Sequence, residues 1–176
     1  MSRVYITSDH HFGHANLLRF QDKAGAYFRG DKFKSVEDMD EEMIARWNAV
    51  VKPDDKVYHL GDFCMSPRTD RILWYANRLN GRKVLIRGNH DKGKLSAYAA
   101  CFKDVRGTHM LETGVNAVTH VVLSHVPLHE SSLRSGWINL HGHTHEKGSP
   151  RGPYASACVE MHDYYPVEWG DFVRGL

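Results

Sequence analysis

The most constraining feature of this chain is a repeated unit in which a strand-like apolar run ends in polar side chains suited to metal binding. Five such runs, rich in β-branched and aromatic residues, occupy positions 3–8, 56–60, 82–87, 120–126 and 137–142. They lead into the sequences "SDHH", "GD", "GNHD", "SH" and "GHTH", respectively. In α/β sheets, ligands bind at the carboxyl ends of the strands, so we expect these side chains to gather at one edge.

Helical patterns separate some of these strands. Residues 35–51 carry apolar side chains at spacings of three and four, with Ser35 and Asp38 placed to form a capping box. A second helix is expected over residues 69–79, ended by the turn dipeptide Asn80-Gly81. The alternation of strands and helices predicts the α/β class. Residues 91–114 and the segment after Lys147 carry no readable pattern.

Length and charge place the chain among ordinary globular proteins. It has 176 residues with no internal repeat or linker, so we expect one domain over residues 1–176. The formal net charge of +2 is close to balanced and gives no sign of non-specific binding to nucleic acid. We expect a cytoplasmic protein, because no apolar run is as long as a membrane span, no signal peptide precedes the first strand, and the three scattered cysteines suit reduced thiols.

The polar residues at the strand ends supply seven potential metal donors. They are Asp9, His11, Asp62, Asn89, His125, His143 and His145. Imidazole, carboxylate and amide groups without thiolate suit divalent metals such as Mn, Fe, Zn or Ni. One ion cannot use seven protein ligands and leave room for a substrate, whereas two ions can if a carboxylate bridges them.

In this order, the motifs resemble those of the calcineurin-like metallophosphoesterases, in particular the small stand-alone bacterial and phage members. That family carries D-x-H, then G-D, then G-N-H-[D/E], then a lone histidine, then G-H-x-H, and this chain supplies each block between Asp9 and His145. The resemblance implies a four-layer α/β/β/α sandwich of two mixed β-sheets flanked by helices. It also implies a metal-dependent phosphoric ester hydrolase with two divalent ions at one sheet edge, with Mn favoured and Fe, Zn, Ni, Co or Mg as alternatives.

The resemblance also implies a role for each motif residue. One ion would be held by Asp9, His11, Asp62 and His145. The other would be held by Asp62, Asn89, His125 and His143, with Asp62 bridging. A hydroxide between the ions would attack phosphorus in line with the leaving group. His90 would assist the leaving oxygen, and Asp91 would orient His90.

The expected substrate is a small or nucleotide-like phosphate mono- or diester. His14, Asn16, Arg19 and Asn89 are candidate substrate contacts because they lie within or near the motifs. The second block reads "GDFCMSPR" and lacks the G-D-x-V-D-R-G pattern of protein Ser/Thr phosphatases, which argues against a phosphoprotein substrate. A nuclease acting on DNA or RNA is the alternative, a non-catalytic scaffold is a third, and the oligomeric state stays open.

The other histidines are interpreted as structural. His10 lies between two ligand candidates and should point away from them, while His59 and His141 should be core residues or support the ligands. The ligand choice of His125 over His120 rests on its place at the end of the apolar run. The stretch "RGDKFK", residues 29–34, is interpreted as solvated charge.

Overall fold

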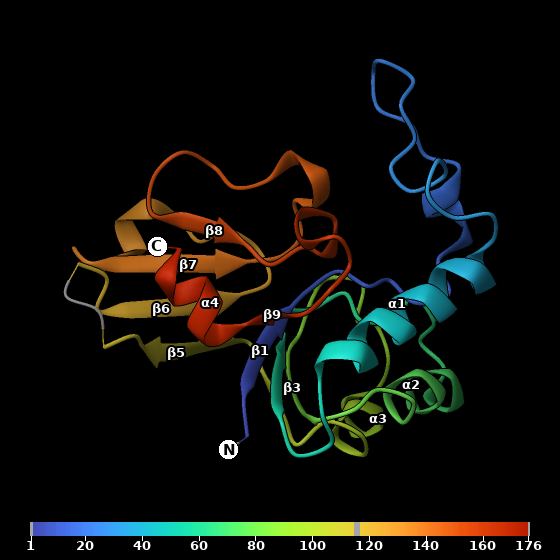
Figure 1. Ribbon diagram of the computed structural model, residues 1–176, viewed down its shortest axis with the longest axis horizontal. Coiled ribbons are helices and arrows are strands. Elements are labelled where there is room, and N and C mark those ends of the chain that lie inside the picture. The colour runs from blue at the N-terminus through green and yellow to red at the C-terminus, as the bar shows by residue number, and fades with distance from the viewer. Residues whose placement is uncertain (1, 115–116, 176) are drawn as a thin grey trace.

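The computed structural model describes residues 2–114 and 117–175, which form two β-sheets packed face to face (Figure 1). The first sheet has the strand order β4-β3-β2-β1-β9. Its parallel strands are β1 (Val4–Thr7), β2 (Lys56–His59), β3 (Arg82–Ile86) and β4 (Asp104–Arg106). The edge strand β9 (Val167–Glu168) pairs antiparallel with β1.

The second sheet has the strand order β5-β6-β7-β8. Strands β6 (His120–Ser124), β7 (Trp137–His141) and β8 (Tyr154–Ser156) are parallel. Strand β5 (Thr108–Glu112) is antiparallel to β6. Both sheets are therefore mixed, and each has a set of parallel strands whose carboxyl ends share an edge.

Side chains that alternate between the two faces of the first sheet divide the core into two parts. Tyr5 of β1 and Val57 of β2 pack in one apolar cluster with the helices. Their neighbours Ile6 and Tyr58 belong to a second cluster that also contains Leu123 of β6. Because successive side chains of a strand point to opposite faces, each strand of the first sheet contributes to both clusters. The second cluster therefore fills the space between the two sheets.

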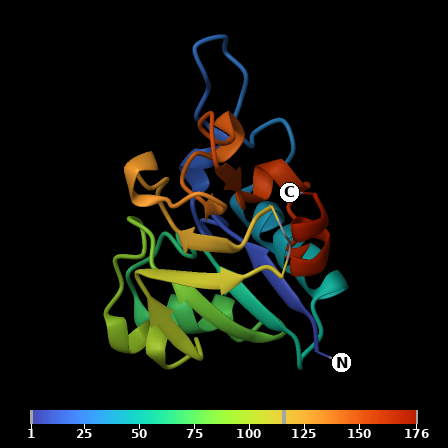
Figure 2. The same cartoon turned by 90° about the vertical axis from the view of Figure 1, so that its left-hand side faces the viewer.

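Three helices cover the outer face of the first sheet (Figures 1 and 2). They are α1 (Val36–Val50), α2 (Thr69–Ala76) and α3 (Leu95–Ala99). The Ser35 hydroxyl accepts a hydrogen bond from the Asp38 amide at 3.1 Å, as a helix N-cap should. The Asp38 carboxylate accepts from the Lys34 amide at 3.0 Å, so the return bond of the cap goes one residue further back than predicted.

Shorter elements complete the layers. Helix α4 (Trp169–Arg174) packs Trp169 and Phe172 against the cluster between the sheets. The 3-10 helices are η1 (Ala15–Leu18), η2 (Glu130–Ser132), η3 (His145–Lys147) and η4 (Val159–His162). On the outer face of the second sheet, the buried Asn139 side chain accepts from the Leu128 amide, so a connecting segment covers that face.

The α/β class with two mixed sheets and flanking helices, which the sequence resemblance implied, is confirmed. The five predicted strands all form, each ending one or two residues earlier than predicted. Helix α2 ends at Ala76 rather than at Leu79. The unreadable region 91–114 contains α3, β4 and β5, and the tail contains β8, β9 and α4. Among the described residues, no helix is long and apolar enough to span a membrane.

Candidate metal centre

The chain turns sharply where it leaves the strands to enter this site. Five of the seven predicted metal ligands have positive φ angles: Asp9 at 62°, His11 at 51°, Asp62 at 54°, His143 at 71° and His145 at 50°. Side chains other than glycine adopt this left-handed region only at a cost, and such strain concentrates at functional sites. The concentration of strained residues at one sheet edge marks this edge as a functional site.

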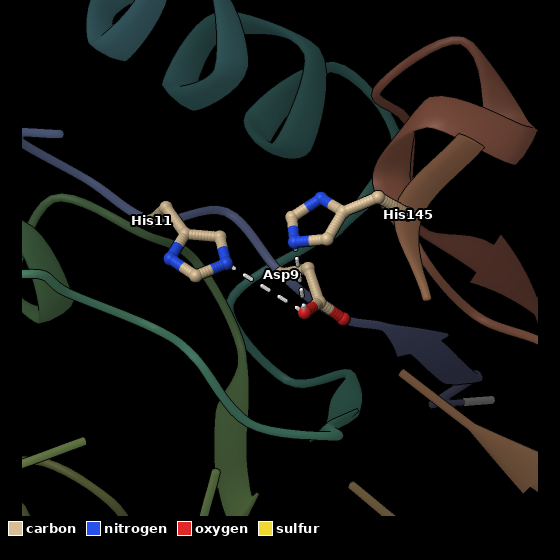
Figure 3. A group of neighbouring side chains, drawn as sticks. All are labelled: Asp9, His11 and His145. Atoms are coloured by element: carbon tan, nitrogen blue, oxygen red, sulfur yellow. Dashed lines mark ion pairs between the residues drawn. The ribbon is translucent and has the colours of Figure 1, made fainter. Parts of the chain in front are cut away.

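The first group of donors consists of Asp9, His11 and His145 (Figure 3). The Nε2 atoms of His11 and His145 lie 3.7 and 3.8 Å from Oδ1 of Asp9. The Asp9 side chain is fully buried, yet its Oδ1 atom and both ring nitrogens of His11 have no hydrogen-bond partner among the described residues. Buried polar atoms without partners are costly, so this arrangement fits a cation held between them.

The second group consists of Asp62, His125 and His143. His125 Nε2 lies 3.3 Å from Asp62 Oδ2 and 2.8 Å from Asn89 Oδ1. Its other nitrogen, Nδ1, lies 2.8 Å from the Leu60 carbonyl and donates to it. This bond fixes the ring with Nε2 toward Asp62 and Asn89.

Asp62 connects the two groups through one oxygen atom. Its Oδ2 lies 3.5 Å from His11 Nε2 in the first group and 3.3 Å from His125 Nε2 in the second. Its other oxygen, Oδ1, accepts a hydrogen bond of 2.7 Å from the His90 amide. The backbone thus holds the carboxylate in one orientation, with a single oxygen between the two histidine groups.

Two glycines allow the carboxylates to sit this close to the backbone. A Cβ atom added at Gly88 would overlap the side chain and amide of Asp62. A Cβ at Gly142 would overlap Ser8 and the carboxylate of Asp9, which accepts a hydrogen bond from the His143 amide at 2.9 Å. The glycines of the "GNHD" and "GHTH" motifs are therefore required by close packing.

His145 is oriented by residues far away in the sequence. Its Nδ1 lies 2.8 Å from Glu160 Oε1, which fixes the ring with Nε2 toward Asp9. Glu160 in turn accepts hydrogen bonds from the buried Arg29 guanidinium at 2.9 and 2.6 Å. Arg29 also donates to the carbonyl groups of Asp9 and His10, at 2.6 and 2.8 Å. One arginine therefore joins the first strand end to the residue that holds His145.

Charge interactions within the site shift several pKa values. Burial alone would raise the pKa of Asp9, but the neighbouring imidazoles, that of His11 first, hold it well below its ordinary value. Burial would likewise raise the pKa of Glu160, and the Arg29 charge brings it to about 2. Burial lowers the pKa of His11, and it lowers that of His14 to about 4. Burial would also lower the pKa values of His125 and His145, but the carboxylates of Asp62 and Glu160 raise them. Cation binding at these two histidines would therefore release protons.

A cavity of about 570 Å³ opens onto these donors. His11, His143 and His145 line it together with His90 and His14. The ring centroid of His90 lies 5.3 Å from that of His11 and 6.5 Å from that of His14. The cavity therefore brings the candidate metal ligands and the predicted leaving-group histidine to one surface.

Comparisons with known proteins agree with this geometry. Residues 2–151 match the family model described as calcineurin-like phosphoesterase. The chain belongs to the calcineurin-like phosphoesterase family.

Relatives and a solved structure extend the match over most of the chain. The chain is 31% identical to an uncharacterized protein of Methanocaldococcus jannaschii. That alignment covers 95% of this chain and 87% of the relative. The chain is also 31% identical to the gene 66 protein of Mycobacterium phage L5, covering 82% of this chain and 78% of that protein. A crystal structure of a protein of unknown function from Aquifex aeolicus shares the fold, with a TM-score of 0.73, 22% identity and full coverage of both chains.

One predicted role in this phosphoesterase-family site needs correction. Asp91 was expected to orient the His90 ring, but its carboxylate accepts hydrogen bonds from the amides of Asp62, Phe63 and Gly88, at 2.9, 2.9 and 2.8 Å. The His90 Nδ1 atom has no hydrogen-bond partner in the described part of the chain. Asp91 therefore fixes the two motif loops to each other, because three amides point at its carboxylate.

Two predicted substrate contacts also lie elsewhere. Asn16 and Arg19 are exposed and do not line the cavity, because η1 turns its buried Leu17 toward the site. His14, by contrast, lines the cavity. Asn89, the fourth candidate contact, places its Oδ1 atom 2.8 Å from Nε2 of His125, a member of the second donor group.

The histidines interpreted as structural lie as predicted. His10 Nδ1 is 2.9 Å from His59 Nε2, and both rings are fully buried on the helix side of the sheet, next to Trp47. The buried His141 ring lies 2.8 Å from the Gly142 carbonyl and 3.1 Å from the Ser149 hydroxyl. None of the three is in either donor group.

Arg29 and Glu160 were not among the residues predicted from the sequence. The stretch "RGDKFK" was interpreted as solvated charge, which is wrong for Arg29, since its exposed fraction is 0%. Neither residue lies in a motif, and they are 131 positions apart. No local signal marks them, because their role depends on which strand ends meet.

Proposed function

We propose that this chain is a two-metal phosphoesterase that hydrolyses small phosphate mono- or diesters. The observation that carries the proposal is the position of Asp62 Oδ2, within 3.5 Å of His11 Nε2 and 3.3 Å of His125 Nε2. A single carboxylate oxygen between two histidine groups suits a pair of divalent ions that share one ligand. The family assignment supports the same reaction class.

In this proposal, each donor group holds one cation. Asp9, His11 and His145 hold the first, Asn89, His125 and His143 hold the second, and Asp62 contributes to both. The donor set lacks thiolate and so favours Mn or a similar first-row ion over soft metals. The two cations, when bound, supply positive charge for the phosphate and a water of lowered pKa for in-line displacement.

The remaining chemistry belongs to His90. Its ring lines the cavity beside His11, and its amide is held by Asp62. Because its ring lines the cavity, His90 is placed to donate a proton to a leaving oxygen. His14 lines the same cavity and can contact the phosphate or the leaving group.

The test is turnover of p-nitrophenyl phosphate and bis-p-nitrophenyl phosphate by purified protein loaded with manganese. His125→Ala should lose activity and one metal per chain, as measured by elemental analysis. His129→Ala is the matched control, because this exposed histidine contacts Ser131 away from both donor groups. No turnover with Mn, Co, Ni or Fe, or equal losses in the two variants, would contradict the proposal.

A further inference from the structure

The segment between β1 and α1 forms a hairpin that projects from the body of the protein (Figures 1 and 2). Its two arms pair where Gln21 meets Tyr27, and the Phe28 amide donates to the Phe20 carbonyl at 3.0 Å. Phe20 and Phe28 are therefore neighbours on opposite arms. Both aromatic side chains line the cavity that holds the candidate metal ligands.

Four apolar side chains line this cavity: Leu17, Phe20, Phe28 and Met65. His143 and the residues of η3 line it as well. Phe20 is 45% exposed although it is a large apolar residue. An exposed aromatic side chain beside a polar reaction centre provides a surface on which a flat or apolar group can stack.

The charged residues around the cavity limit the charge that the substrate can have beyond its scissile phosphate. Apart from the histidines, the charged residues among the described lining are Glu146 and Lys147, which balance each other. Polyphosphates and nucleic-acid backbones are bound by several cationic side chains. The part of the substrate that lies beyond the scissile phosphate should therefore be uncharged.

The hairpin is fixed relative to the metal centre. Arg29 follows Phe28 directly, is fully buried, and bonds Glu160 and the carbonyl groups of Asp9 and His10. The hairpin that carries Phe20 and Phe28 is therefore anchored to the same strand end that supplies candidate metal ligands. Such an anchor places a stacked group at a defined distance from the phosphate.

We infer that Phe20 and Phe28 bind an aromatic substituent of the phosphate ester, as found in aryl esters and in nucleotides with one phosphate. This inference rests on the proposed function for the position of the phosphate. It makes the two phenylalanines specificity residues, and it excludes polyphosphates and simple alkyl phosphates as preferred substrates.

A binding experiment tests the inference without requiring turnover. Calorimetric titration of the manganese-loaded protein compares phenylphosphonate with methylphosphonate, which share the phosphonate group and differ in the ring. Stacking on an aromatic side chain predicts that phenylphosphonate binds about 5- to 100-fold more tightly. Phe20→Ala should remove most of this preference, while Tyr27→Ala, on the same hairpin but outside the cavity lining, should keep it.

Turnover then separates the two proposals. Phe20→Ala and Phe28→Ala should lower kcat/KM by about 5- to 100-fold for phenyl phosphate or adenosine monophosphate, and by less than about twofold for ethyl phosphate. If kcat/KM falls for only one of these two aromatic esters, that ester shows whether the phenylalanines bind a phenyl group or a nucleobase. Equal binding of the two phosphonates by the unaltered protein would overturn the inference, whether or not the protein is active. Preferential binding of phenylphosphonate without turnover of any ester would support it and refute the proposed function.

Discussion

Replacement of Arg29 by methionine should destabilise the protein strongly, although no motif contains this residue. Arg29 is 0% exposed and donates to Glu160, whose side chain is only 6% exposed. Methionine has a similar length and suits the neighbouring Met39 and Met43, whose sulfur atoms lie 3.7 and 3.8 Å from the guanidinium. The substitution therefore removes the charge while filling most of the space.

The loss in free energy of unfolding depends on Glu160, which stays buried without its partner. Removal of one member of a buried ion pair costs about 3–5 kcal/mol, because the remaining charge stays buried without compensation. The carbonyl groups of Asp9 and His10 also lose this donor, which places the cost toward the upper end. For a chain of this size, the unfolding temperature should fall by about 6–20 °C.

Urea and thermal unfolding in EDTA at pH 8, followed by circular dichroism, measure this cost for the metal-free protein. Arg29 and the other site charges hold the pKa of Glu160 at about 2, against an ordinary value of 4.5. Its stabilising contribution is therefore complete above pH 4.5 and is lost as the pH falls toward 2. Without Arg29 the pKa of Glu160 rises, so the difference between wild type and variant should be larger at pH 8 than at pH 5.

Two controls make this prediction sharp. The exposed pair Arg68–Asp70 has a similar distance, 2.8 Å, but its side chains are 73% and 61% exposed, so Arg68→Met should cost less than about 1 kcal/mol. The double variant Arg29→Met, Glu160→Gln should recover part of the loss, because no uncompensated charge remains. If Arg29→Met were no more destabilising than Arg68→Met, the reasoning about the buried pair would be refuted.

Further variants test the metal centre. Asp62→Asn should reduce bound manganese from two ions per chain to one or fewer by elemental analysis; retention of both would argue against a bridging carboxylate. Glu160→Gln should weaken metal affinity by about 10- to 100-fold in calorimetry, since His145 loses its orienting acceptor; unchanged affinity would dismiss this role. His90→Gln should keep both metals but lower kcat by about 10²–10⁴-fold, most for poor leaving groups. Gly142→Ala should displace Asp9 and lower metal content, and a fully loaded variant would refute the steric argument.

Local sequence predicted the strands and their polar ends well. The runs that end in Asp9, Asp62 and Asn89 are short, apolar and rich in β-branched residues, and they do form adjacent parallel strands. Their meeting at one edge could be anticipated, because parallel strands present their carboxyl ends at the same edge of a sheet. The seven candidate donors could therefore be named before their geometry was known.

Other elements could not be predicted from a local sequence pattern. Strand β4 (Asp104–Arg106) has three residues and β9 (Val167–Glu168) has two, too few to display a period. They form because neighbouring strands offer unpaired backbone groups at the sheet edge. The same dependence on context explains why Asp91, adjacent to His90 in sequence, bonds three amides rather than the ring beside it.

The sequence by itself determined which side chains could bind metal, because donor type and position at a strand end are local properties. The tertiary structure alone decided how those side chains are held. It joined Arg29 to Glu160, placed Asp62 Oδ2 between two histidine groups, and set Phe20 and Phe28 against the cavity. These relations connect residues up to 131 positions apart, and they exist only once two sheets and a projecting hairpin have packed together.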